Sequence, residues 1–329
     1  MKFLKIIRIL YGTIQKNAVD LLFALVLSLL VVFCLHPDRF AVHYNYIDKQ
    51  SIASELEPAY WPKINSCKLN SLESKKSTLL YPNENPKIDA QGLAQKYNVQ
   101  IGGAWKPSDC KPLFNVAIIL PYRNRLKQLS IFINYIHPYL QLQNLDYTIF
   151  VIEQSKNKEF NRGKLFNVGF TEAMKIRNFH CFIFQDIDLI PQNPENIYTC
   201  SRLPRHMSSN VNTFRYNLPY SGLFGGAISI TKQQFQQVNG FSNVYFGWGG
   251  EDDDFYSRLQ NKGYPICRFC PDVAQYYMLS HKKETPNKER FTYLKSGSKR
   301  YDTDGLRNLE YKVLDQKLEP LYSWFLVDI

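Results

Sequence analysis

The sequence lacks the glycine-rich motifs with which common nucleotide-binding proteins hold phosphate. Among its 329 residues there is no Gly-x-x-x-x-Gly-Lys-Ser/Thr loop, and no Gly-x-Gly-x-x-Gly follows an expected strand. Those loops supply the backbone N–H groups that hold phosphate in P-loop ATPases and in dinucleotide-dependent dehydrogenases. Their absence argues against both classes.

A nucleic-acid-binding signature is also missing, although the net charge is +11. The sequence has no basic helix, zinc finger or RNA-binding motif to go with that charge. A small polyanion such as a nucleotide, or an anionic membrane surface, explains the excess of Lys and Arg equally well. The apolar fraction of 45% is ample for the core of one large domain or two modest ones.

One long apolar run lies near the amino terminus. Residues 21–35 are uncharged, and Ala18 and Val19 extend the run across Asp20. The run is long enough for a short membrane span, and no small-residue cleavage site follows it. Four basic residues precede it, so the positive-inside rule places the amino terminus in the cytosol and the rest of the chain in a lumen. These features favour a type II signal anchor over a buried core helix, and a short span is typical of early secretory or Golgi membranes.

The anchor divides the chain into four predicted regions. We expect a cytoplasmic tail at 1–17, a transmembrane signal anchor at 18–36, a lumenal stem at 37–105 and a folded domain at 106–329. The stem lacks sustained periodicity, is rich in Pro, Ser, Asn and Lys, and contains no Asn-x-Ser/Thr glycosylation acceptor.

Cysteine is scarce, at seven residues, and Cys34 lies within the expected span. The other six form an even set, as expected for disulfides in an oxidising lumen, but the residues alone leave the pairing open. Cys267 and Cys270 have the spacing of a zinc half-site. No second such pair completes four ligands, which argues against zinc.

From Phe114 onwards, strands and helices are expected to alternate. The segments 114–120, 147–152 and 181–184 are apolar runs of strand length, and helical patterns follow the first two. This order predicts an α/β domain with a mostly parallel sheet. Ligands of such sheets bind beyond the carboxyl ends of the strands. Six charged residues fall at those ends: Arg123, Arg125, Arg162, Lys164, Asp186 and Asp188.

The Asp186-Ile-Asp188 motif is short and common, but its chemistry is clear. One carboxylate can bind a divalent metal ion while the other orients a ribose or a metal-bound water. The metal would bridge the two phosphates of a nucleotide and stabilise them as a leaving group. The neighbouring arginines would neutralise the remaining phosphate charge.

The stretch from Tyr220 to Asp254 combines two glycine pairs, Trp248 and four consecutive acids at 251–254. Four adjacent carboxylates repel one another, and ordered glycine loses much conformational entropy. A solvated acidic loop is the alternative interpretation of the acids. The aromatic and glycine residues that precede the acids favour a functional site, because a solvated loop needs neither kind of residue.

Six blocks of the sequence resemble, in order, those of the animal β1,4-galactosyltransferase family: FNVAIILPYRNR, FNRGKLFNVGF, FIFQDIDLIP, FGGAISITKQQF with VNGF, GWGGEDDDF and TDGLRNLEYKVL. The resemblance extends from about Cys67 to Ile329. It implies a GT-A glycosyltransferase fold, a type II Golgi anchor, a UDP-sugar donor, Mn²⁺, and inversion to a β1,4 linkage on a GlcNAc-terminated acceptor.

The resemblance also implies roles for individual residues. The metal ligands would be Asp188, Met278 and His281. Asp252 would be the general base, with Glu251 beside it. The donor would contact Pro121, Tyr122, Arg123, Arg125, Phe160, Arg162, Asp186, Leu223 and Trp248. The acceptor would contact Tyr220, Gly250, Glu251, Asp252, Arg290 and Phe291. Two disulfides are implied, Cys67–Cys110 and Cys181–Cys200, and Cys267 and Cys270 stay unassigned.

Two departures from the family pattern bear on specificity. The loop at 282–289 is about three residues shorter than in the vertebrate pattern. Leu223 stands where galactose-transferring members have Tyr, and so resembles the invertebrate branch that transfers GalNAc. A smaller side chain without a hydroxyl leaves room for the acetamido group. GalNAc is therefore the expected donor sugar, with galactose as the alternative; an inactive lumenal lectin or scaffold is the alternative from another class.

Overall fold

The computed structural model describes residues 2–35, 42–60, 65–69, 78–87, 89–282 and 284–329. The chain divides into two compact units, the first ending at Val42 and the second beginning at His43. Residue 36 of the predicted anchor and parts of the predicted stem lie outside the described residues, as does residue 283 of the 282–289 loop.

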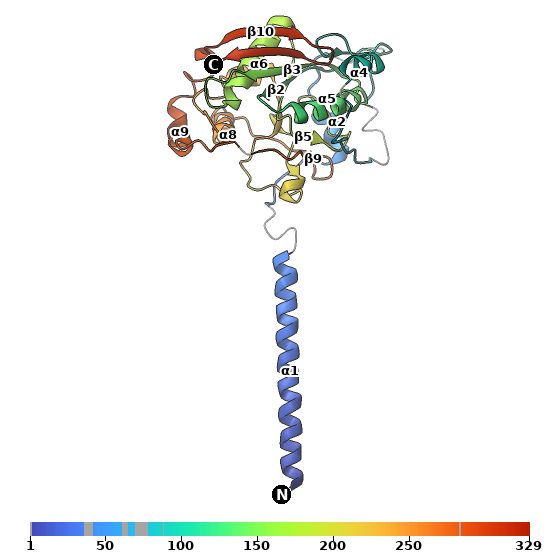
Figure 1. The fold of residues 1–329 in the computed structure, drawn as a ribbon, viewed down its shortest axis with the longest axis vertical. Coiled ribbons are helices and arrows are strands. Elements are labelled where there is room, and N and C mark those ends of the chain that lie inside the picture. Colours follow the sequence, from blue (N-terminus) through green and yellow to red (C-terminus); the bar gives the residue numbers. More distant parts are fainter. Residues whose placement is uncertain (1, 36–41, 61–64, 70–77, 88, 283) are drawn as a thin grey trace. The chain divides into compact units, whose positions relative to one another are not determined.

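The first unit contains one helix, α1 (Lys2–Leu35), drawn in blue in Figure 1. From Gln15 to Leu35 it is long and apolar enough to cross a membrane. Its apolar side chains in that stretch are exposed, as Leu21 (77%) and Phe23 (69%) illustrate. A helix of this length and composition fits the predicted anchor.

The second unit is built on a mixed sheet in the order β10-β11-β3-β2-β4-β8-β6, with β1 paired to β3. Its centre is parallel, as predicted, and its edges are antiparallel. The central strands are β2 (Asn115–Tyr122), β3 (Asp146–Gln154), β4 (Cys181–Gln185) and β11 (Ser323–Asp328). The edge strands are β1 (Ala104–Trp105), β6 (Arg205–His206), β8 (Ala227–Thr231) and β10 (Lys312–Leu318).

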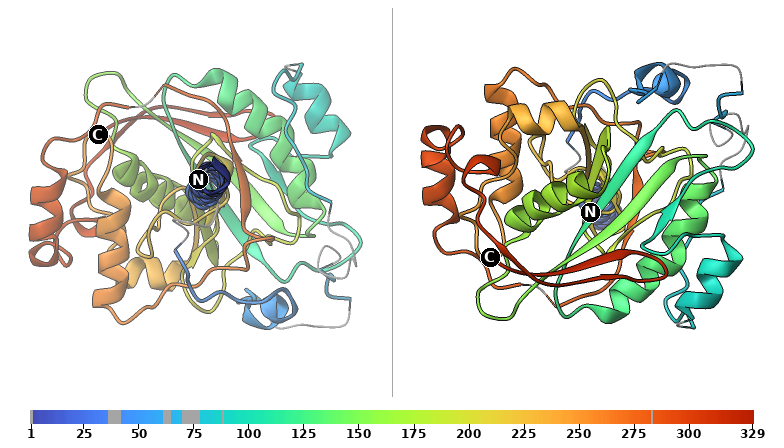
Figure 2. Two further views of the ribbon diagram at one scale, coloured as in Figure 1. Left: turned by 90° about the horizontal axis from the view of Figure 1, so that it is seen from below. Right: turned by 90° about the horizontal axis from the view of Figure 1, so that it is seen from above.

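Helices cover both faces of this sheet (Figure 2). All eight residues of β2 are buried, because alternate side chains enter two different cores. Val116 and Ile118 pack in the core that contains α5, whereas Ala117 and Ile119 pack in the core that contains α6. The continuous apolar run of this segment is thus explained by burial on both sides.

Short elements complete the unit. A second sheet has the order β5-β9-β7, from β5 (Leu189–Pro191), β9 (Gln275–Met278) and β7 (Asn210–Val211). The helices are α2 (Ile52–Glu55), α4 (Ala90–Lys96), α5 (Leu126–Gln141), α6 (Arg162–Ile176), α7 (Lys232–Gln237), α8 (Glu251–Asn261) and α9 (Arg290–Ser296). Single 3-10 turns lie at 49–51, 212–214, 297–299 and 306–308.

The described residues of the predicted stem from His43 onward belong to the second unit and pair with other parts of it. Ile47 forms a parallel bridge with Phe269, Leu56 forms an antiparallel bridge with Ser201, and β1 adds to the main sheet. The region before residue 106 therefore supplies structure to the unit that follows it.

Both disulfides implied by the family resemblance are present. Cys67 is bonded to Cys110 across a separation of 43 residues, and Cys181 is bonded to Cys200 across 19. The first joins the predicted stem to the segment before β2. Cys34, Cys267 and Cys270 are free.

Candidate active site

A cleft of about 680 Å³ opens at the carboxyl ends of β2 and β4. It is lined by all the predicted donor, acceptor, metal and catalytic residues except Tyr122. Tyr122 is 9% exposed and packs in the core on the α5 side, because it has the opposite parity on β2 from Pro121, which does line the cleft. Segments far apart in sequence thus meet at the position where α/β sheets bind ligands.

Arg162, the first residue of α6, joins three parts of the cleft. Its Nε donates to Asp186 Oδ1 at 2.5 Å, its Nη1 to Glu251 Oε1 at 3.3 Å, and its Nη2 to the Gly226 carbonyl at 3.2 Å. Burial lowers the pKa of Arg162, but the nearby carboxylates outweigh that effect and leave the pKa above its ordinary value. Arg162 therefore keeps its positive charge and lines the cleft, where it can bind phosphate.

Asp188, His281 and Met278 form the predicted metal-binding group. Asp188 Oδ2 lies 2.9 Å from His281 Nδ1 and 2.7 Å from Arg125 Nη1. The hydrogen bond to Asp188 raises the pKa of His281. Met278 reaches the same place because β9 pairs with β5, where Met278 lies opposite Leu189.

These side chains fit a divalent cation in part. Within the described residues, no set of three His, Cys, Asp or Glu side chains has metal-binding spacing. Asp188 and His281 already converge as a carboxylate and an imidazole, both common ligands. The Met278 thioether lines the same cleft and is the third ligand that the family resemblance implies. Asp188, His281 and Met278 would hold the cation, and Arg125, now paired with Asp188, would have to give up that contact.

The four consecutive acids form the first turn of α8, and each has different neighbours. Glu251 pairs with Arg162, Asp253 accepts from the Tyr220 hydroxyl at 2.8 Å, and Asp254 pairs with Arg258 at 2.6 Å in the core. Acids at a helix amino terminus are favoured by the helix dipole. The run is thus part of a structured site, and the alternative of a solvated loop is wrong.

Asp252 is the acid without a cation so close. Its Oδ1 accepts from the Asp253 backbone N–H at 3.0 Å, and its other oxygen faces Gly225, where an added Cβ would lie 2.4 Å away. Burial, followed by the charges of Glu251 and Asp253, raises the pKa of Asp252 to about 7. A carboxylate with this pKa is well matched to accept a proton near neutral pH.

Trp248 lies in a turn whose neighbours Gly247, Gly249 and Gly250 all have φ between 84° and 98°. Only glycine adopts this region at no steric cost. The indole is 59% exposed over the cleft. Its backbone N–H donates to the Thr285 carbonyl at 2.8 Å, and its carbonyl accepts from the Asn287 N–H at 2.9 Å. The turn is thus tied to the segment that leads into α9.

Comparison with known proteins supports one family. Residues 67–201 match the N-terminal region of glycosyl transferase group 7, and residues 205–282 match the N-terminal domain of galactosyltransferase. β-1,4-Galactosyltransferase 2 of Cricetulus griseus is 35% identical, and the match covers 98% of this chain and 97% of that protein. The chain belongs to the β1,4-galactosyltransferase family.

Other members are similar over shorter spans. β-1,4-Galactosyltransferase 1 of Mus musculus is 45% identical over 246 residues, and the match covers 74% of this chain but only 62% of the mouse protein. The catalytic domain of Drosophila β1,4-galactosyltransferase 7, solved with xylobiose, has a TM-score of 0.55 and 28% identity and covers 65% of this chain and 92% of that one. A variant of the same Drosophila protein was solved with manganese, UDP-Gal and xylobiose. These neighbours confirm the predicted GT-A fold.

Sequence reasoning missed several residues of this family member's cleft. They come from short strands, turns, loops and the short helix α9, none of which has a sustained periodic pattern. They include His206, Ser208, Val211, Phe214, Pro219, Glu284 and Leu294. The Gly225-Gly226 pair was the signal noted near them, as part of the glycine-rich stretch that favoured a site.

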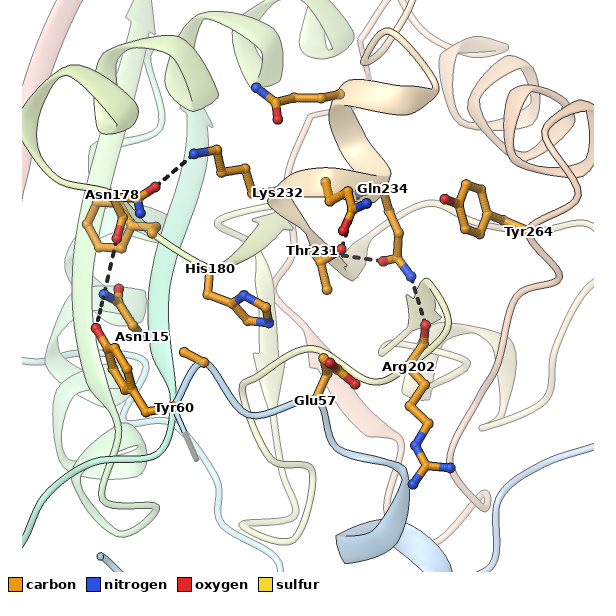
Figure 3. Close-up of a pocket in the computed structure, with 14 residues that line it drawn as sticks. Glu57, Tyr60, Asn115, Asn178, His180, Arg202, Thr231, Lys232, Gln234 and Tyr264 are labelled. Carbon is orange, nitrogen blue, oxygen red and sulfur yellow. Dashed lines mark hydrogen bonds between the residues drawn. The ribbon is translucent and has the colours of Figure 1, made fainter. Parts of the chain in front are cut away.

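A second cavity, of about 460 Å³, lies at the opposite, amino ends of β2 and β4 (Figure 3). Its polar groups largely bind one another: Asn115 Nδ2 donates to the Tyr60 hydroxyl, and Lys232 Nζ donates to Asn178 Oδ1 at 2.8 Å. Asn115 Oδ1 and His180 Nε2 have no partner among the described residues, but both atoms are buried. The cavity contains none of the predicted site residues, so the cleft is the candidate active site.

Proposed function

We propose that this protein transfers a hexose from a UDP-sugar to the 4-hydroxyl of a terminal GlcNAc with inversion, and that its preferred donor is UDP-GalNAc. The observation that carries the proposal is Asp252, a partly buried base in the same cleft as Arg162 and Asp188. A base, phosphate-binding cations and a carboxylate for a metal ion are the three parts that direct displacement of UDP requires.

In this mechanism, Asp252 accepts the proton of the acceptor 4-hydroxyl. The hydroxyl oxygen then forms a bond to the anomeric carbon, while the bond from that carbon to the UDP oxygen breaks and UDP departs with the electron pair. Arg123, Arg125 and Arg162 line the cleft where they can neutralise the diphosphate. Attack on the face opposite the leaving group inverts the anomeric centre.

Asp188, His281 and Met278 would hold the Mn²⁺ that the family resemblance implies. When bound, this cation supplies Lewis-acid stabilisation of the diphosphate. We expect chelation by EDTA to abolish transfer and Mn²⁺ to restore it. Full activity after exhaustive chelation would contradict the assignment.

Leu223 supports GalNAc as the donor sugar, because it lines the cleft where galactose-transferring members have Tyr. A smaller aliphatic side chain leaves space for the acetamido group and removes a hydroxyl that would hold it unproductively. Galactose is the second candidate, because the similar relatives are named as galactosyltransferases and the Drosophila variant was solved with UDP-Gal.

The test uses the full chain in detergent with Mn²⁺ and a GlcNAc-terminated acceptor. Rates with UDP-GalNAc and UDP-Gal are compared for the wild type and for Leu223→Tyr. We expect GalNAc to be preferred and the substitution to reverse that preference. Preference for galactose in the wild type would make the protein an ordinary galactosyltransferase. No transfer from either donor, with UDP still bound, would favour the inactive lectin or scaffold.

The proposed compartment is the Golgi lumen, with the chain anchored as a type II membrane protein by α1. The composition of α1 and the basic residues before the apolar run support this topology. In sealed Golgi vesicles, we expect added protease to leave the second unit intact until detergent is added. Digestion without detergent would indicate the opposite topology.

A further inference from the structure

The residue that determines the donor sugar in the proposed function lies on a short loop, residues 220–225. The loop is closed by a hydrogen bond from the Leu223 N–H to the Tyr220 carbonyl at 3.2 Å. Tyr220 and Leu223 both line the cleft. Because the loop belongs to neither a helix nor a strand, its position depends on contacts from outside it.

Arg268 makes such contacts with the 220–225 loop. Its Nη2 donates to the Ser221 and Leu223 carbonyls, each at 2.8 Å. Its Nε donates to His206 Nδ1 at 3.1 Å, which requires the neutral imidazole; burial lowers the pKa of His206 and keeps it neutral. Arg268 is only 5% exposed, so these bonds are largely shielded from water.

Tyr44 packs its ring against the Arg268 guanidinium. Its ring centroid lies 5.2 Å from the guanidinium carbon, within the range of a cation–π contact. Its hydroxyl donates to Asn210 Oδ1 at 2.8 Å, and Asn210 is buried at the start of β7. The ring is thus fixed at its hydroxyl end as well as against the arginine.

The backbone beside Tyr44 is fixed to the same place. The Ile47 N–H donates to the Arg268 carbonyl at 2.8 Å, and the Ile47 carbonyl accepts from the Cys270 N–H at 3.0 Å. These bonds make the parallel bridge between Ile47 and Phe269, which fixes residues 43–48, here called the 43–48 segment, within the second unit. These residues lie in the region that sequence reasoning assigned to a stem.

From these contacts we infer that the 43–48 segment is a positioning element of the donor-sugar pocket: Tyr44 shields Arg268, and Arg268 fixes the loop that carries Leu223. The inference rests on the proposed function. The two arginine–carbonyl bonds are strong because water cannot reach them. Removing the Tyr44 ring would let water solvate the guanidinium, compete with the Ser221 and Leu223 carbonyls, and loosen the loop.

The test compares Tyr44→Ala, Tyr44→Phe and wild type as full chains in detergent. For Tyr44→Ala we expect the KM for the preferred UDP-sugar to rise at least about fivefold, the lower end of the range for a shielded cation–π contact. The Kd for UDP should stay unchanged, because the nucleotide does not contact the 220–225 loop. The KM for the acceptor can rise as well, because Tyr220 lies on that loop. Tyr44→Phe keeps the ring over Arg268 and should retain most of the donor affinity.

Tyr46→Ala is the matched control, since Tyr46 lies on the same segment, is 49% exposed and contacts Tyr44 only edge-on. It should behave as wild type. An unchanged donor KM in Tyr44→Ala, or an equal loss of UDP affinity, would overturn the inference. A wild type that transfers no hexose would instead contradict the proposed function.

Discussion

The four consecutive acids of α8 have different roles, because each carboxylate has different neighbours. Asp254 is buried against Arg258 and Asp253 binds the Tyr220 hydroxyl, so both help to hold the structure. Glu251 Oε2 is buried without a hydrogen-bond partner among the described residues, and Asp252 has a raised pKa. A folded protein tolerates such groups where a ligand satisfies them.

The pKa of Asp252 sets the expected pH dependence of the reaction. Because the pKa is about 7 in the free protein, the base form declines about tenfold for each pH unit below that value. We expect kcat/KM for transfer to rise with slope one between pH 5 and pH 6.5 and to level off above pH 8. A flat profile across this range would rule out Asp252 as the base.

Replacing Asp252 with Asn should separate activity from stability. Loss of the base should lower kcat at least about a hundredfold, while the Kd for UDP stays nearly unchanged. Because the folded-state pKa is raised from 3.8 to about 7, the stability of the protonated form is lost as pH rises through 7. The Asn variant should therefore melt at a higher temperature than wild type at pH 8, with a smaller gain at pH 5.

A lower melting temperature for Asp252→Asn at pH 8 would mean that the carboxylate is structural. Asp253→Asn provides the comparison, because that residue is also in the first turn of α8 and its hydrogen bond from Tyr220 survives with an amide oxygen. We expect it to keep most of the transfer activity.

At the scale of elements, the central strands could be predicted because both of their faces are buried. The apolar runs at 114–120, 147–152 and 181–184 correspond to β2, β3 and β4. The flanking strands could not be predicted in the same way. β10 is mostly exposed, and β6 has only two residues, so neither carries an apolar run; their pairing is determined by neighbours distant in sequence.

The candidate site was largely predictable, but from the family resemblance rather than from periodicity. Asp188 and the arginines follow strands, a position that α/β sheets use for ligands. Nothing in the local pattern around Met278 or His281 indicated a site. Tyr122 shows that a residue within a matching motif need not line the cleft. Its side chain lies on the opposite face of β2 from Pro121 and packs in the core.

The packing of α6 on β2 gives a prediction in which two physical effects oppose each other. Helix propensity favours Gly169→Ala by about 1 kcal/mol. A Cβ at Gly169 would, however, lie 2.2 Å from Ile119 Cγ2. We expect overpacking to prevail and the variant to lose roughly 1–3 kcal/mol of stability, measured as a lower thermal midpoint.

Thr171→Ala is the control in the same helix, because it adds no atoms. It removes the hydrogen bond from Thr171 Oγ1 to the Asn167 carbonyl at 2.9 Å, but such bonds favour a helix little and Ala has the higher helix propensity, so the midpoint should rise slightly or stay constant. A stabilised Gly169→Ala variant would show that α6 can move away from Ile119.

At the scale of the whole molecule, the Cys67–Cys110 bond makes the predicted stem part of the second unit. It closes a loop with a separation of 43 residues. Loop-closure entropy predicts that Cys67→Ala with Cys110→Ala lowers the stability of this unit by about 4 kcal/mol. Thermal unfolding of the full chain measures the change, with Cys34→Ala as the control because Cys34 is free. An unchanged midpoint would show that the segment before β2 is held by packing alone.

The division of the chain could be anticipated only in outline. The apolar run and its charged flank predicted an anchor, and the structure has a separate helical unit there. The expected boundary at residue 105 rested on composition, which does not show that Ile47 and Leu56 bridge to residues more than a hundred positions away. Such pairings depend on the folded surface, so a polar, irregular segment can be as firmly placed as a strand.

The turn around Trp248 has a consequence for inherited variation. Three of the four residues from 247 to 250 are glycines with positive φ. Any missense change at those three codons adds a side chain where the backbone tolerates one poorly. The turn is at the rim of the cleft, outside both hydrophobic cores. Alleles at Gly247 and Gly249 should therefore yield a folded protein whose transferase activity is impaired, whereas a side chain at Gly250 would also collide with the buried ring of Tyr245.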